Sequence, residues 1–177
     1  MCRAIVDADS EIQLCVSTTT RAPRSGEVDG KDYYFLSPEE FERRVVAGEF
    51  LEHAAISGHR YGIERRNFLR VSEAGKDLAI NIDYVGARTL RESCGEQLVV
   101  IYLEPPSLEV LRERIAKRGD ASEELIRKRL ELAEIEMVAL SDPQLTTYRV
   151  INNSLDSALA DVRCIIRSER LRLDRFS

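Results

Sequence analysis

The sequence predicts an α/β fold with a mostly parallel sheet flanked by helices. Three short apolar runs rich in β-branched residues, at 78–82, 98–103 and 148–151, have the length and composition of strands buried on both faces. Helical patterns separate these runs, and strands that alternate with helices are typical of parallel sheets. A chain of 177 residues with 44% hydrophobic content is long enough for one well-filled domain.

A short amphipathic helix is predicted to begin after Ser37 and to end at Gly48. Ser37 has the position of an N-cap, Pro38 stands at the first helical position and Glu40 at the third. Apolar residues at helical spacing follow before the glycine stop.

Three further helices are predicted in the C-terminal half, at 107–118, 122–140 and 155–171. The first begins with the cap residue Ser107 and ends at Gly119, whereas the second is long and charged. The third carries an apolar stripe formed by Leu155, Leu159, Val162 and Ile166. The sequence shows no internal repeat and no low-complexity linker.

The charge of the chain limits the classes of ligand. The net charge of −5 and the isoelectric point near 5.3 disfavour binding to long nucleic acid. Of 26 basic residues four are lysines, which leaves 22 arginines, and the planar arginine fork suits phosphate oxygens. A general composition bias explains this excess equally well, so only arginines at particular positions support a phosphate site.

Cysteine and histidine usage predicts a reduced, cytoplasmic protein. The four cysteines are widely spaced, without a C-x-x-C pair, and the chain has two histidines, so neither a zinc site nor a disulfide framework is expected. No apolar run reaches the length of a membrane span, and acidic residues near the N-terminus replace the apolar stretch of a signal peptide. The sequence leaves open whether the chain forms a homo-oligomer.

Polar clusters follow two apolar segments, at the position where ligands of parallel sheets usually bind. One cluster begins at Ser17, directly after the short apolar segment 14–16, and the run ending at residue 82 leads into Asp83. Arg21 and Arg24 can converge on one phosphate from a loop that a proline restricts. Hydroxyls of Ser17, Tyr33 and Tyr61 are further candidate donors. A polar turn with incidental arginines is the alternative interpretation.

Several ordered segments resemble guanylate kinases. The stretches "VSTTTRAPRSGEVDGKDYYF" and "GEFLEHAAISGHRYG" look like the family's GMP-binding region. Further on, "INIDYVGA" is similar to its strand with paired aspartates, and "YLEPPSLEVLRERIAKRG" and "EELIRKRL" to its lid segments. The stretch "YRVINNSLDSAL" is similar to its last strand and helix, so the resemblance covers nearly the whole chain.

The resemblance implies a fold and a reaction. Guanylate kinases have a P-loop-kinase-like parallel sheet and transfer the γ-phosphoryl of ATP to GMP with magnesium, in purine nucleotide metabolism. The implied organisation is one domain over 1–177, with a small GMP-binding subdomain at 18–78, a helical lid at 112–130, and the remainder as core. ATP and GMP are the implied ligands, without a partner membrane or long nucleic acid.

The resemblance also assigns the residues that bind GMP. Those implied to hold its phosphate are Ser17, Arg21, Arg24, Tyr33 and Tyr61. Glu52 matches the glutamate that reads guanine by accepting from N1–H and the 2-amino group, which adenine cannot offer. Without its neighbours, Glu52 would be interpreted as a solvated acid at a strand end. Asp83 matches an aspartate that organises the base and metal side of the pocket.

Two lid arginines are the implied catalytic residues. Arg118 and Arg129 match the arginines that close over the transferring phosphoryl group and stabilise its oxygens. No side chain is expected to act as nucleophile. From the residues alone, both arginines could be solvated charges on arginine-rich helices. Arg118 and Asn152 are the implied ATP-binding residues, although an asparagine at a strand end is also an ordinary turn residue.

Two departures from the family concern the base pocket. Ile63 stands where the resemblance implies serine or threonine after Tyr-Gly, and Asn81 stands where one of two aspartates is usual. Ile63 cannot donate a side-chain hydrogen bond to guanine O6, which costs about 0.5–1.5 kcal/mol for one such bond. We therefore expect weaker GMP binding, but not its loss.

The family's phosphate-binding P-loop, G-x-x-x-x-G-K-[ST], does not occur in the sequence. The two Gly-Lys pairs, at 30–31 and 75–76, are each followed by aspartate, which cannot replace the hydroxyl that helps to bind magnesium. In register with the family, Met1 falls directly after the P-loop. The resemblance thus implies that the first strand and the P-loop are missing.

Two explanations of this difference lead to different functions. In one, the reading frame begins upstream or the gene is truncated, and the protein is a guanylate kinase. In the other, it is a catalytically inactive module that binds GMP or a phosphorylated partner. The two lid arginines, which a phosphopeptide binder does not need, favour the first. Because the lost strand is central in the family, we expect the 177-residue chain alone to be poorly stable and nearly inactive.

Overall fold

The computed structural model describes residues 1–56, 58–73, 75–117 and 122–173. The chain forms two compact units, Met1–Ser93 and Cys94–Ser177. Each unit is described by itself below.

The first unit begins with a helix and a parallel strand pair. Helix α1 (Cys2–Ala8) leads into β1 (Ile12–Leu14), which pairs in parallel with β6 (Asp77–Ala79). Helix α4 (Tyr84–Cys94) follows β6 and is buried along one side. The predicted parallel pairing and the strand near residue 78 are confirmed, although β6 is shorter than expected.

A four-stranded sheet forms the larger part of this unit, in the order β3-β2-β5-β4. Its strands are β2 (Thr18–Thr19), β3 (Tyr34–Phe35), β4 (Phe50–Ile56) and β5 (His59–Glu64). Strand β2 is parallel to β3 and antiparallel to β5, which in turn is antiparallel to β4. The prediction of parallel strand pairing therefore does not hold for this mixed sheet. The consecutive strands β4 and β5 are too close in sequence for the crossover connection that parallel strands need.

The two faces of this sheet carry different side chains. Glu52 lies opposite Ile63, and Tyr61 stands two residues earlier on β5, so these three residues share one face, the front face. Phe50 lies opposite Glu64 on the other face, the back face. An irregularity in register between Phe50 and Glu52 turns two residues of the same strand to opposite faces.

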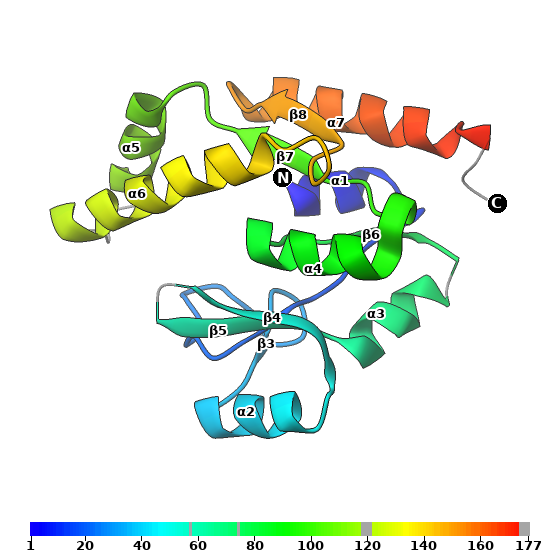
Figure 1. Ribbon diagram of the computed structural model, residues 1–177, viewed down its shortest axis with the longest axis vertical. Helices are drawn as coiled ribbons and strands as arrows, with labels where there is room; N and C mark the ends of the chain where they lie inside the picture. Colours follow the sequence, from blue (N-terminus) through cyan, green and yellow to red (C-terminus); the bar gives the residue numbers. More distant parts are fainter. Residues whose placement is uncertain (57, 74, 118–121, 174–177) are drawn as a thin grey trace. The chain divides into compact units, whose positions relative to one another are not determined.

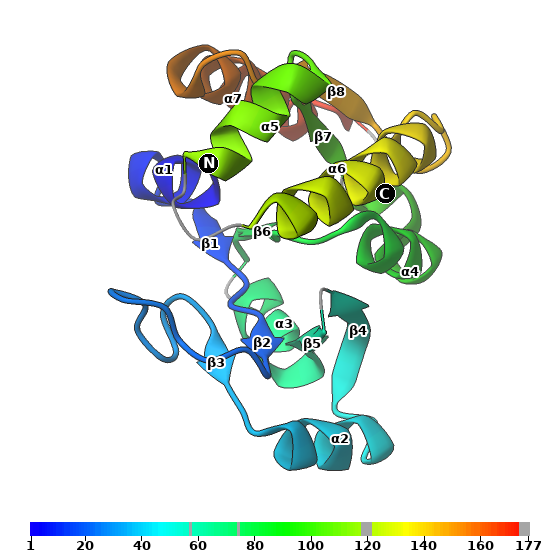
Figure 2. The ribbon, with the colours of Figure 1, turned by 90° about the vertical axis from the view of Figure 1, so that its left-hand side faces the viewer.

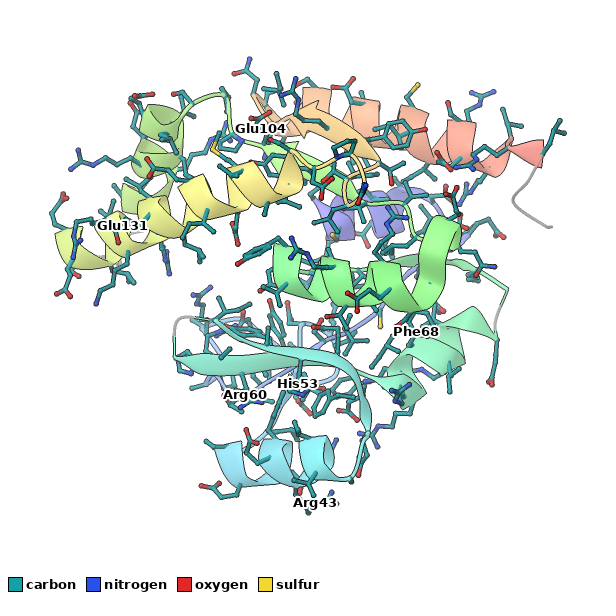
Figure 3. All side chains as sticks on the ribbon, viewed as in Figure 1. Arg43, His53, Arg60, Phe68, Glu104 and Glu131 are labelled. Atoms are coloured by element: carbon teal, nitrogen blue, oxygen red, sulfur yellow. The ribbon has the colours of Figure 1, made fainter. Side chains whose placement is uncertain are left out.

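Helix α2 (Pro38–Val46) lies beside the sheet (Figure 1). It packs on the back face through one aromatic side chain. Phe41 is fully buried, and its ring stacks on that of Phe50 with 4.4 Å between centroids. The Arg60 guanidinium also lies over the Phe41 ring, 5.5 Å from its centroid. Figure 3 labels Arg60 on β5 and Arg43 on α2. The Ser37 hydroxyl accepts from the Glu40 N–H, which confirms the predicted cap.

A fully buried carboxylate, Glu64, connects the back face to two helices. It accepts from the Thr18 hydroxyl at 2.7 Å and from the Arg44 Nη1 at 3.0 and 3.1 Å. The Nε of Arg66, on α3 (Arg65–Ser72), lies 2.7 Å from its second oxygen. A buried charge needs such partners, because its hydration is lost.

The second unit pairs two parallel strands and adds three helices (Figure 2). After a short 3-10 helix, η1 (Gly95–Gln97), strand β7 (Ile101–Glu104) pairs in parallel with β8 (Tyr148–Ile151). The three helices are α5 (Leu108–Ala116), α6 (Glu123–Leu140) and α7 (Leu155–Arg170). All three begin after a serine whose hydroxyl accepts a backbone N–H, as predicted for the first of them from Ser107.

The prediction that the three apolar strands are buried on both faces is wrong. Of the residues in β6, β7 and β8 only Val150 is buried, and Ile151 is 53% exposed. Within the described part of the chain, β6 pairs with β1 alone and β7 with β8 alone. Both strands of a two-stranded sheet are edge strands, so solvent reaches side chains that a wider sheet covered by helices would bury.

The described helices include none that is long and apolar enough to cross a membrane. Each of the four cysteines is a free thiol, as the sequence predicted. Burial raises the pKa of Cys15 to about 11, so this thiol stays protonated at neutral pH.

Candidate functional site

Three predicted phosphate-binding residues lie together in the first unit. The Arg21 guanidinium carbon is 5.4 Å from the centre of the Tyr33 ring, and the Tyr33 and Tyr61 rings are 6.1 Å apart. A hydrogen bond with the Tyr61 side chain contributes to a raised pKa of Arg21, after the larger effect of Glu27. Tyr61 belongs to the front face, so we call these three residues the front cluster. The cluster combines one fixed positive charge with two hydroxyl donors.

An acid that the sequence analysis did not select, Glu27, holds the arginine of the front cluster. Arg21 Nη2 donates to both Glu27 oxygens, at 2.8 and 2.9 Å, and Arg21 Nη1 donates to the Ala22 carbonyl at 2.7 Å. The Glu27 carboxylate also accepts from the Arg24 N–H at 2.7 Å, which closes the turn. This leaves other guanidinium donors of Arg21 for a ligand. The signal in the sequence was an acid six residues after Arg21, inside the same glycine-bearing loop.

The other two predicted phosphate ligands lie near the cluster without joining it directly. Arg24 is exposed, and its charge is close enough to counteract the raised pKa of Tyr33, whose main cause is burial. Ser17 is half-buried, and its carbonyl accepts from the Tyr34 N–H at 2.9 Å. Both residues flank the β2–β3 pair that positions the cluster.

Glu52 is the buried carboxylate of the front face. It is 8% exposed and lies opposite Ile63, which is 1% exposed. Burial and, to a smaller extent, the nearby Asp83 charge raise the pKa of Glu52 to about 7, against the lowering effect of a hydrogen bond from the Ile63 N–H. The predicted alternative of a solvated acid is wrong, because the surrounding side chains exclude water. A carboxyl that titrates near neutral pH inside a protein is a candidate for ligand binding.

Asp83 and Gly86 fix the start of α4 beside this carboxylate. The Asp83 carboxylate accepts from the Gly86 N–H at 2.9 Å, so Asp83 caps the helix. A Cβ at position 86 would lie 2.7 Å from Glu52 Oε2 and 2.6 Å from Ile82. Any larger residue at position 86 would therefore require the Ile82 and Glu52 side chains to move.

The predicted donor-side residues belong to the second unit. Arg129 is half-buried on α6. Asn152 follows β8, where its N–H donates to the Glu104 carbonyl at 2.7 Å and its carbonyl accepts from Arg114 at 2.8 Å. Arg118 lies outside the described residues.

A protein-family comparison decides the family of the chain. The model described as guanylate kinase matches residues 3–169. The chain belongs to the guanylate kinase family. The predicted family is thereby confirmed.

Individual guanylate kinases are similar over nearly the full chain. The guanylate kinase of Caldanaerobacter subterraneus subsp. tengcongensis is 42% identical over 175 residues, which are 99% of this chain and 83% of that protein. The guanylate kinase of Symbiobacterium thermophilum is 43% identical over 175 residues, 99% of this chain and 81% of that protein. By name these relatives are transferases of the nucleoside monophosphate kinase class, and they favour the kinase over the inactive module.

A solved guanylate kinase has the same fold. The crystal structure of guanylate kinase from Anaplasma phagocytophilum matches with a TM-score of 0.80 and 33% identity, over 98% of this chain and 82% of that one. The predicted α/β fold of the P-loop-kinase type is confirmed.

The two departures from the guanylate kinase pattern have different surroundings. Ile63 is buried on the front face directly opposite Glu52, so its apolar side chain lies beside this carboxylate. Asn81 is exposed. Of the two, Ile63 is therefore the residue placed to influence a ligand at Glu52.

Proposed function

We propose that the chain transfers the γ-phosphoryl group of ATP to GMP, giving ADP and GDP. The observation that carries the proposal is the front face, where a buried carboxylate and an arginine–tyrosine cluster occur in one guanylate kinase unit. The carboxylate supplies acceptors for guanine, and the cluster supplies donors for a phosphate.

On the acceptor side, each part of GMP has a matching group. Glu52 accepts from guanine N1–H and the 2-amino group when it is ionised, whereas adenine presents an acceptor at N1 and leaves the carboxylate unpaired. The phosphate is bound by Arg21, Tyr33 and Tyr61, with Arg24 and Ser17 completing the ring of donors. Asp83 keeps α4 against Glu52.

On the donor side, we assign Arg118 and Arg129 to the transferring phosphoryl group and Asn152 to the adenine end of ATP. A GMP phosphate oxygen attacks the γ-phosphorus, the bond to the bridging oxygen of ADP breaks, and the arginines stabilise the charge on the equatorial oxygens. No side chain takes part covalently.

The family implies magnesium, but the part of the chain that the structure describes contains no cluster of protein ligands for it. No group of three or more acidic, histidine or cysteine residues comes together there to hold a metal ion. Magnesium commonly keeps several waters and binds through nucleotide phosphates. We therefore assign it to ATP and derive no step from it.

We further propose that residues 18–78 form the GMP-binding subdomain and 112–130 the lid, with the remainder as core. Such parts close around substrates to exclude water before transfer. This division is consistent with the front face lying between residues 17 and 64 of the first unit.

The decisive experiment measures GDP formed from GMP and ATP, with AMP in place of GMP as control. The 177-residue chain is assayed beside one extended by any upstream in-frame codons. GDP formation by either chain supports the proposed kinase. GMP binding without turnover in both contradicts it and supports the inactive module.

Replacement of Arg21 should separate phosphate recognition from base recognition. For Arg21→Gln we expect GMP affinity to fall by about 10–100-fold, since a charged hydrogen-bonding group contributes about 1.5–3 kcal/mol. Guanosine, which lacks the phosphate, should bind equally to both proteins. Titration calorimetry with the two ligands checks this, and an equal loss for guanosine would contradict the assigned role.

Replacement of the described lid arginine should affect turnover alone. For Arg129→Ala we expect kcat to fall by about 10–100-fold while GMP affinity stays unchanged, because the arginine contacts the phosphoryl group during transfer. Arg127→Ala is the matched control, because Arg127 lies on the same helix, exposed and paired with Glu131. Equal turnover in the two variants would remove Arg129 from the mechanism.

A further inference from the structure

A groove opens on the back face of the sheet, at its β3 edge. It has a volume of about 350 Å³ and is lined by Tyr34, Arg66, Asn67 and Arg70. Tyr34 lies opposite Thr18, whose hydroxyl bonds to Glu64 on the back face. Tyr34 therefore points away from the front cluster, and the groove is separate from the proposed GMP site. Figure 3 marks α3, which supplies the other three residues, by its Phe68.

The groove is positively charged. Arg66 and Arg70 stand one helical turn apart on α3, so their side chains share one side of the helix. Arg66 is 64% exposed and bonds through Nε to Glu64, a carboxylate that Arg44 already neutralises. Arg70 is exposed and forms no ion pair within the described ranges. Two guanidinium groups thus face the groove without a matching number of acids.

An unpartnered amide adds a second, independent observation. Asn67, between the two arginines, is 6% exposed, and its Nδ2 has no hydrogen-bond partner among the described residues. Buried amide donors are nearly always bonded, so an exception calls for a partner. The residues that line the groove therefore combine an amide donor with two arginines and a tyrosine.

We propose that this groove binds the phosphate group of a small phosphorylated ligand. Arginine forks and an amide offer more donors than one planar carboxylate can accept, whereas a phosphate presents oxygens in several directions. The volume falls in the range of small-molecule sites, which leaves room for the group that carries the phosphate. The proposal does not depend on kinase activity, because its residues are separate from those assigned to GMP and ATP.

The test uses inorganic phosphate as the probe and NMR as the readout. The full chain, labelled with ¹⁵N, is titrated with phosphate through the millimolar range at constant ionic strength, with chloride as the compensating salt. The side-chain amide signals of Asn67 report the groove directly. We expect these signals to shift and to saturate with phosphate but not with chloride.

Variants distinguish the groove from the front cluster. In Arg70→Gln, the phosphate affinity obtained from the Asn67 signals should fall by at least about tenfold, since the substitution removes one charged donor. Arg21→Gln, which alters the front cluster, should leave the Asn67 shift intact. Arg43→Gln is the matched control, because Arg43 is an exposed arginine on α2 outside the groove. Circular dichroism confirms that each variant is folded.

Four results would overturn the proposal, and the first three concern the groove itself. They are an Asn67 signal that does not move with phosphate, one that moves equally with chloride, and an unchanged phosphate affinity in folded Arg70→Gln. Loss of the Asn67 shift in Arg21→Gln would also contradict it, because the binding would then belong to the front cluster. Absence of GDP formation in the kinase assay would not bear on phosphate binding in the groove.

Discussion

Glu52→Gln should abolish most of the affinity for GMP. The variant replaces a carboxylate that accepts two guanine hydrogen bonds with an amide that offers one acceptor and one repelling donor group. Two charge-assisted bonds of about 1.5–3 kcal/mol each correspond to a loss of about 10²–10⁴-fold. Titration calorimetry with GMP measures the loss directly.

A matched control is Glu39→Gln, which alters an exposed glutamate at the start of α2 on the back face. GMP affinity should be unchanged in this control. Guanosine should lose the same factor as GMP in Glu52→Gln, because the base alone is affected. Retention of GMP binding by a folded Glu52→Gln protein would contradict the assignment of Glu52 to guanine.

The same residue should make guanine binding depend on pH. Burial, with Asp83 nearby, raises the pKa of Glu52 to about 7, and only the ionised form accepts from guanine. Below this pH, the free protein must first lose a proton, so affinity should fall about tenfold for each pH unit. Guanosine is the suitable ligand, because a phosphate has a pKa near 6 of its own. Glu52→Gln should show no such dependence.

The stability of the unliganded protein should fall as the pH rises, whereas guanine affinity should increase. The folded state raises the pKa of Glu52 from 4.5 to about 7. The contribution of Glu52 to the free energy of unfolding is therefore fully present below pH 4.5 and is lost as the pH rises through 7. Glutamine stays neutral, and at about pH 8 we expect Glu52→Gln to be more stable by roughly 2–3 kcal/mol. Such an increase beside lost binding would identify Glu52 as a residue kept for function at a cost in stability.

Local features of the fold were predictable because nearby residues determine them. The caps at Ser37 and Ser107 depend on a hydroxyl and a backbone N–H three residues away, and the structure contains both. The burial of the strands was not predictable in this way, because it depends on which elements cover them. The exposed Ile151 shows that apolar composition alone does not bury a strand.

The sequence motif named residues of the candidate site, but it did not predict their pairing and burial, which depend on tertiary contacts. The motif named Arg21, Tyr33 and Tyr61, which lie close together, whereas the pairing of Arg21 with Glu27 is visible only in the folded loop. The depth of Glu52 depends on a register irregularity and on the approach of α4. No residue pattern within one segment reveals either feature.

Arg44→Met should cause a large loss of stability in the first unit. Arg44 donates to both oxygens of Glu64, which is fully buried, and methionine keeps much of the side-chain volume without the charge. The Thr18 hydroxyl and Arg66 remain as partners, but removal of one member of a buried ion pair typically costs about 3–5 kcal/mol. Urea unfolding monitored by circular dichroism should show a lower midpoint at neutral pH.

Arg43→Met tests whether burial is the cause. Arg43 neighbours Arg44 on α2 and also pairs with Glu40, but its side chain is 60% exposed, so its loss should cost less than about 1 kcal/mol. The double variant Arg44→Met with Glu64→Leu removes both charges and should recover part of the stability lost in Arg44→Met. Equal effects of Arg43→Met and Arg44→Met, or no recovery in the double variant, would show that Glu64 does not depend on Arg44 for its burial.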